Sequence, residues 1–172
     1  MTLSPNWRRT LLTVHVATAV GWLGSDFVML ALGISGLSGG DPDVVYPAMY
    51  LVARAVFAPL SFVVLLVAVL NGLLTPWGLV RWWWVVVKLF LVTLMVVLVV
   101  LSLLPGLALA ADLRGALPAG DRVNMVVAPS VSTTMMLVAT VLSTFKPWGR
   151  TPWSRAPRGA ARPARGVPAG PS

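Results

Sequence analysis

Four long apolar runs follow one another along the chain, separated by short stretches rich in Gly, Pro and charged residues. The runs cover residues 10–35, 48–74, 81–104 and 123–145. Each exceeds the roughly 20 residues that an α-helix needs to cross the hydrocarbon core of a bilayer. We therefore predict an all-α fold: a polytopic membrane protein built as a bundle of four transmembrane helices.

Turn-forming residues mark the ends of the runs. Gly-Gly and Asp-Pro pairs predict a loop over residues 36–47, and Pro105-Gly106 predicts the end of the third helix. Pro59 is expected to kink the second helix because its ring frees a backbone carbonyl group. Residues 107–122 mix charged and apolar positions, which predicts a connection that includes a short surface helix.

The two ends of the chain are polar. Residues 1–9 predict a short cytoplasmic N-terminus. Residues 146–172 are rich in Pro, Gly, Ala and Arg and contain no acidic side chain. Such a composition cannot bury a core, so we expect a disordered basic tail. Its arginines should be attracted to anionic lipid headgroups.

Charge predicts the orientation in the membrane. The chain is 58% hydrophobic and 10% charged, with a net charge of +8. With the N-terminus inside, nine basic residues are cytoplasmic, namely Arg8, Arg9, Arg81, Lys146 and the five arginines of the tail. All five aspartates then lie on the outer half, which is the distribution that the positive-inside rule describes. We expect both termini to be cytoplasmic.

The same distribution bears on partners and location. Most basic residues adjoin apolar runs, so the positive charge indicates membrane topology and argues against a nucleic-acid partner. The abundance of Ala, Val, Gly, Pro and Arg is typical of high-GC bacterial genomes, which favours the bacterial plasma (inner) membrane. The chain has no Cys, which excludes disulfides and thiolate metal sites. The expected partners are the lipid bilayer and, as an open alternative, further copies of the chain in a homo-oligomer.

The first apolar run carries a polar stripe. An α-helix turns by about 100° per residue, which places His15, Trp22, Asp26 and Gly33 on one face. A charge that faces lipid costs at least ~2.5–3.5 kcal/mol. This face is therefore predicted to line the interior of the bundle.

Two polar layers follow from the depths of these residues. His15 and Lys88 lie at matching depth on parallel helices, ~9–10 Å from the inner edge, and Asn71 and Thr140 reach a similar level. The alternatives for this layer are a Lys88 that extends to the headgroups and a His15 that makes an interhelical hydrogen bond.

The second layer is predicted near the outer ends of the first two helices. Asp26 and Arg54 are expected to form an intramembrane ion pair there, with either a structural role or a role as a gate or relay. No set of metal ligands is evident, because His15 and Asp26, the pair that shares a helix face, are ~16 Å apart along the axis.

Two short motifs carry a resemblance. His15-x6-Trp22-x-Gly24 is similar to the first-span motif of the small four-helix bacterial membrane proteins around the copper-resistance CopD domain and the HemJ-type protoporphyrinogen oxidase. Trp84-x3-Lys88 begins a stretch that resembles the W-x-x-x-K-L-x-L motif of a later span in that group. The chain also resembles short uncharacterised membrane proteins of high-GC bacteria.

The resemblance implies that His15 and Lys88 are a functional pair, associated with haem or a porphyrin, with Trp22 as a further cofactor-binding residue. Residues 23–26 depart from the HemJ-like pattern, which has aromatic and basic residues there. Three functions follow as hypotheses. The first is a haem- or porphyrin-binding protein with a redox role, in which His15 and Lys88 would be catalytic. The second is a small transporter or proton-coupled channel component, and the third is a structural subunit of a membrane complex.

Overall fold

The computed structural model describes residues 4–74 and 78–152. Its elements, in chain order, are α1 (Pro5–Leu37), α2 (Pro42–Val52), the π-helical turn η1 (Ala53–Phe57), α3 (Ala58–Leu74), α4 (Trp83–Leu98), the π-helical turn η2 (Val99–Leu103), α5 (Leu104–Leu113), the 3-10 turn η3 (Arg114–Ala116) and α6 (Ala119–Phe145). The predicted disordered tail is wrong for its first residues, 146–152, which fold back beside the start of α4, where Thr151 is buried and its amide donates a 3.0 Å hydrogen bond to the carbonyl of Arg81. Residues 153–172 lie outside the described residues, so their disorder stays a prediction.

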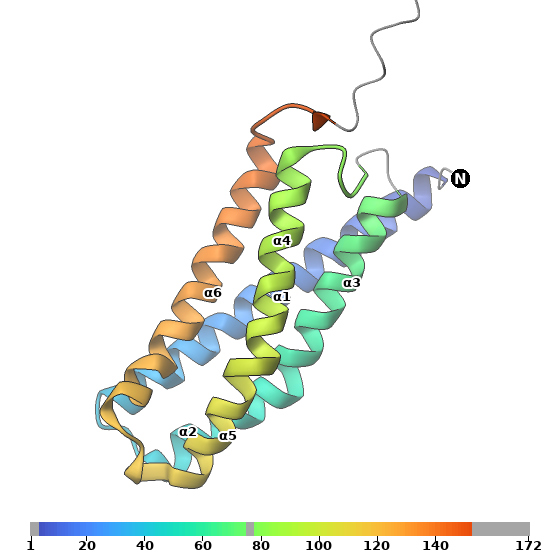
Figure 1. Cartoon of the computed structure of the whole chain (residues 1–172). Helices are drawn as coiled ribbons and strands as arrows, with labels where there is room; N and C mark the ends of the chain where they lie inside the picture. The colour runs from blue at the N-terminus through green and yellow to red at the C-terminus, as the bar shows by residue number, and fades with distance from the viewer. Residues whose placement is uncertain (1–3, 75–77, 153–172) are drawn as a thin grey trace, which may run out of the picture.

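These elements join into four long rods. Segments α2, η1 and α3 form one continuous helix, and α4, η2 and α5 form another, so that with α1 and α6 four helices are long and apolar enough to cross a membrane. The predicted four-helix bundle is confirmed. Contacts link α1 to α3, α3 to α4, α4 to α6 and α6 back to α1, which closes a ring of neighbours (Figure 1).

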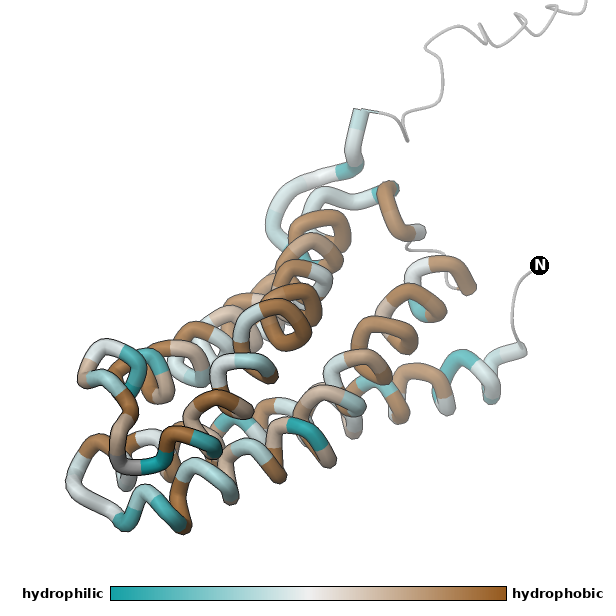
Figure 2. The backbone as a smooth tube through the Cα atoms, turned by 60° about the horizontal axis from the view of Figure 1, so that its bottom comes forward, coloured by the Kyte–Doolittle hydropathy of each residue, from teal (hydrophilic) through white to brown (hydrophobic). Residues whose placement is uncertain are grey.

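The outer surface of the bundle is apolar. Many large hydrophobic side chains are exposed on every rod, among them Val20, Phe62, Phe90 and Val141. Figure 2 shows hydrophobic positions along all four rods and hydrophilic positions at the connections between α1 and α2 and between α5 and α6. Such a surface suits contact with lipid and marks a multi-pass membrane protein.

The predicted loop over residues 36–47 is wrong in its length. Helix α1 continues to Leu37 and α2 begins at Pro42, so that only four residues connect them. The Asp41 carboxylate accepts a hydrogen bond of 3.0 Å from the amide of Asp43 and caps α2. Pro42 occupies the first turn of that helix, where a missing amide donor has no cost.

The predicted end of the third helix at Pro105-Gly106 is also wrong. The chain passes through η2 and continues as α5 to Leu113, so residues 104–113 prolong this rod and no separate surface helix forms there. Proline lacks an amide donor, and the wider π-turn directly before it changes the hydrogen-bond spacing at that point. The same arrangement precedes Pro59, where the expected irregularity takes the form of η1.

Helices α1 and α6 are in backbone contact at a glycine. A Cβ atom added to Gly33 would lie 2.5 Å from the carbonyl oxygen of Met125, so the backbones touch here. The helices run antiparallel. Asp26 lies seven residues before Gly33, and Ser132 lies seven residues after Met125. In antiparallel helices these two positions are therefore at the same level.

The two ends of the bundle differ in charge. At one end lie Arg8, Arg9, Arg81, Lys146 and Arg150, and we call this the basic end. At the other lie Asp41, Asp43, Asp112 and Asp121 with Arg114 and Arg122, and we call this the acidic end. The described chain begins and finishes at the basic end (Figure 1). The segment after α6 is joined there to the segment before α4, because the hydroxyl of Thr151 donates a 2.6 Å hydrogen bond to the carbonyl of Val80.

We expect the basic end to face the cytoplasm, because basic residues beside membrane spans are retained there. Reporter fusions after Pro42 and Gly120 should behave as external. Fusions after Gly78 and Ser172 should behave as cytoplasmic. The paired reporters, one active only inside and one only outside, control for expression. An external signal after Ser172 would contradict this orientation.

Candidate functional site

A cavity of about 450 Å³ opens among all four rods near the basic end. Its polar wall consists of Arg8, His15, Asn71, Lys88, Ser143 and Lys146, and apolar side chains such as Leu12, Leu89 and Val92 form the rest. We call this space the basic cavity. Four of its side chains are basic and none is a carboxylate, so it is suited to a ligand that combines an apolar body with anionic groups.

Lys88 is directed inward by two neighbours. Its ammonium group donates a short hydrogen bond to the hydroxyl of Ser143 on α6. The same nitrogen lies 5.9 Å from the ring centroid of Trp84, one turn earlier on α4, within the range of a cation–π interaction. These contacts favour an inward-facing Lys88 over one that only extends along the lipid surface.

His15 lies on the α1 side of the cavity. Its side chain is half-buried, and its Nδ1 atom is buried with no hydrogen-bond partner among the described residues. Asn71 supports this wall, because its amide donates at 3.0 Å to the carbonyl of Val67 and at 3.5 Å to that of Leu11. The second bond ties α3 to α1 one turn before His15. An imidazole nitrogen can ligate a metal or accept a proton. Because Nδ1 is enclosed, a ligand in the cavity would meet the other ring nitrogen, Nε2.

The predicted inner layer is thus partly assembled. His15, Lys88 and Asn71 line one cavity, but Thr140 does not. Thr140 is exposed and donates at 2.9 Å to the carbonyl of Met136 on its own helix. Its expected place is taken by Ser143, three residues later. The choice between these two hydroxyls depends on how α6 is rotated about its axis, which the chain's polarity pattern alone does not specify.

Trp22 is not part of the basic cavity. The side chain is completely buried and packs edge-to-face against Phe57, with ring centroids 5.8 Å apart and an interplanar angle of 82°. The expectation that Trp22 joins His15 and Lys88 at one cofactor is therefore not supported by its position.

Arg8 and Lys146 also line the basic cavity, which the sequence did not lead us to expect. Both lie at the ends of apolar runs, and we interpreted their charges only as signals of membrane topology.

The predicted Asp26–Arg54 ion pair does not form. Asp26 is completely buried, and neither carboxyl oxygen has a hydrogen-bond partner among residues 4–74 and 78–152. Arg54 is exposed on η1. The ion pair found among the described residues joins Arg114 to Asp43 at 3.6 Å, at the exposed acidic end. Equal depth on neighbouring helices did not bring the two charges together, because their side chains leave the helices in different directions.

This arrangement makes a double-mutant cycle informative. Asp26→Asn, Arg54→Gln and the double variant should change the free energy of unfolding additively, within about 0.5 kcal/mol, as expected for groups that do not interact. Thermal or denaturant unfolding in detergent measures the three values. A coupling energy well above that limit would mean that the two side chains pair after all.

The described part of the chain contains no group of three His, Asp or Glu side chains that could hold a metal ion. Comparison with family models, curated proteins and solved structures gives no match for the chain. The resemblance to the CopD and HemJ-like proteins thus stays a prediction, and the case for a function depends on the residues of the basic cavity.

Proposed function

We propose that the chain is a membrane protein that binds haem or a porphyrin-like molecule in the basic cavity. The single observation that carries this proposal is the meeting of His15 and Lys88 in one space of about 450 Å³ whose wall is otherwise largely apolar. Ligand cavities in proteins commonly have volumes of ~300–1,000 Å³ with a few polar groups that fix the orientation of the ligand.

The residues present fit such a ligand. His15 lines the cavity and would supply a ring nitrogen for iron, which we take to be Nε2 because Nδ1 is enclosed. Lys88, Arg8 and Lys146 supply positive charge for the two propionate groups, and no carboxylate of the wall opposes them. Bound haem would supply the one-electron chemistry of its iron. The chain itself would bind and orient the ring and shield one of its faces from water.

The first test is whether the wild-type protein binds added haemin in detergent. We expect a shifted Soret band and saturable binding with one ligand per chain. Haemin dimethyl ester, which lacks the negative charges, should bind more weakly. A protein that takes up neither compound would overturn the proposal, and equal affinity for both would remove the role assigned to the basic residues.

Lys88→Gln tests the charge more directly. Loss of a hydrogen bond to a charged group costs about 1.5–3 kcal/mol, so the dissociation constant for haemin should rise roughly 10- to 150-fold. The affinity for the dimethyl ester should barely change. Arg81→Gln is a matched control, because Arg81 is a basic residue at the same end that does not line the cavity.

A further inference from the structure

A group of buried polar atoms lies in the bundle away from the basic cavity. Neither oxygen of the Asp26 carboxyl has a hydrogen-bond partner among the described residues, and the same holds for Nε1 of Trp22 and the hydroxyl of Ser132. Trp22 lies one turn before Asp26 on α1. Ser132 faces the carboxyl from α6, without the geometry of a hydrogen bond. Buried polar groups in native proteins nearly always have partners, so this cluster needs a physical explanation.

Among residues 4–74 and 78–152, no positive charge compensates Asp26. Of the elements packed against α1, α3 contains no ionisable side chain, and η1 contributes the exposed Arg54. The acidic and basic residues of α6 and α2 lie near the ends of the bundle, and Asp43 of α2 is paired with Arg114. His15 and Lys88 are in the basic cavity, and His15 is 11 residues, or ~16 Å, from Asp26. An ionised carboxylate in such surroundings is very costly, whereas a neutral carboxylic acid is tolerated.

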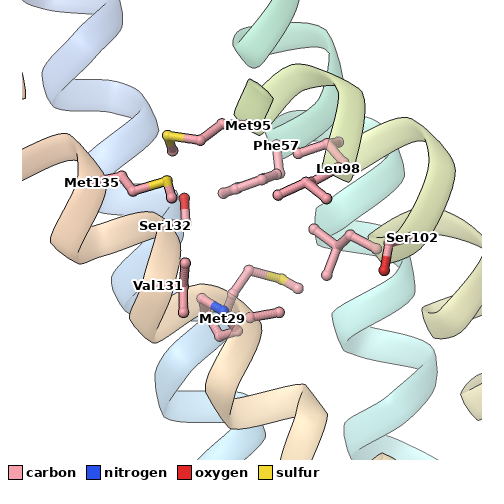
Figure 3. Close-up of a pocket in the computed structure, with 12 residues that line it drawn as sticks. Met29, Phe57, Met95, Leu98, Ser102, Val131, Ser132 and Met135 are labelled. Carbon is pink, nitrogen blue, oxygen red and sulfur yellow. The ribbon is translucent and has the colours of Figure 1, made fainter. Parts of the chain in front are cut away.

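A second cavity, of about 200 Å³, adjoins this cluster. Ser132 and Met29 line it together with Met95, Phe57 and Leu98 (Figure 3). Ser132 is therefore the side chain that both faces the Asp26 carboxyl and reaches the cavity. Leu98 is exposed on the outer surface of the bundle, so part of the wall borders the lipid.

The helices around this cavity depart from regular α-helical structure or contain a proline. Phe57 belongs to η1, Val99 and Ser102 belong to η2, and Pro129 interrupts the hydrogen bonds of α6. Two of the four long helices thus have a π-helical turn at the level of this cavity, and a third has a proline inside its α-helix. π-Helical turns inside α-helices are frequent at functional sites.

We propose that Asp26 is a proton-binding site inside the membrane domain, loaded with a proton in the arrangement described here. On release, the O–H bond of the acid breaks, the electron pair stays on the carboxylate, and the proton passes to a water molecule that enters the second cavity. Ser132 holds an unused donor that faces the carboxyl, and it would turn toward the carboxylate to stabilise it. This proposal is independent of the ligand of the basic cavity.

Modification with dicyclohexylcarbodiimide tests the loaded state. A protonated carboxyl adds across a C=N bond of this apolar reagent and rearranges to a stable N-acylurea, with no leaving group. We expect one label per full-length chain in liposomes at neutral pH, located at Asp26 by mass spectrometry. Asp26→Asn should remain unlabelled, and the aspartates of the acidic end should not react in the wild type. Labelling of the wild type elsewhere, or equal labelling of Asp26→Asn, would overturn the proposal.

Infrared spectroscopy provides a readout that does not depend on access of the reagent. The wild type should show the carbonyl band of a protonated carboxylic acid, and this band should shift in heavy water and disappear in Asp26→Asn. Ser132→Ala should change the pH range over which the band disappears, because the carboxylate loses a donor. Thr134→Ala, a change of an exposed hydroxyl on the same helix, should leave the pH range unchanged. A wild-type spectrum without the band at neutral pH would refute the proposal.

Discussion

His15→Ala should abolish the Soret shift that haemin undergoes on binding to the wild-type protein. In the proposed complex the imidazole is the protein ligand to iron, and the second imidazole that a bis-histidine site would need is missing, because His15 is the one histidine of the chain. Among the described residues, no other histidine, cysteine or carboxylate lines the basic cavity and could replace it. The loss of iron ligation should therefore be complete.

Two measurements separate ligation from general damage to the cavity. Metal-free protoporphyrin carries the same propionate groups but no iron, so its affinity should be nearly the same for wild type and His15→Ala. Free imidazole added to the variant should enter the space left by the side chain and restore the shifted spectrum. A variant that keeps the wild-type Soret band without imidazole would show that His15 is not the ligand.

The helical architecture was predictable because it depends on one-dimensional properties. Four apolar runs of sufficient length predict four membrane helices whatever the details of packing. The interior position of the α1 stripe was predictable for a similar reason, since a 3.6-residue period places Trp22, Asp26 and Gly33 on one face, and all three are buried. Properties that follow from the length and the hydrophobic period of one segment can therefore be predicted without knowledge of how the helices pack.

The errors concern properties that depend on two segments at once. Proline was interpreted as the end of a helix at Pro105, but a π-turn accommodates it and the rod continues. Depth along the membrane correctly brought His15 and Lys88 to one cavity. Depth does not give the rotation of each helix about its axis, however. Because of this rotation, Ser143 lines the cavity where Thr140 was expected, and Arg54 is exposed on the surface and does not face Asp26.

Gly33 lies at a backbone contact between α1 and α6, so its replacement should have the largest effect on stability. A Cβ atom at this position would lie 2.5 Å from the carbonyl oxygen of Met125 and 3.1 Å from its carbonyl carbon. These are backbone atoms, which cannot move aside without displacing a helix. Gly33→Ala should lower the free energy of unfolding by about 1–3 kcal/mol, as overpacking does in closely packed interiors, and Gly33→Val should lower it further.

Gly24→Ala on the same helix is the matched control. No atom lies within 4 Å of a Cβ atom added at Gly24, so the alanine should be neutral or stabilising by up to about 1 kcal/mol through its higher helix propensity. Thermal unfolding in detergent, followed by circular dichroism, measures each variant. Equal stabilities of Gly33→Ala and Gly24→Ala would contradict the close α1–α6 contact. Because that contact also brings His15 and Ser143 to the same cavity, Gly33→Ala should weaken haemin binding, whereas Gly24→Ala should not.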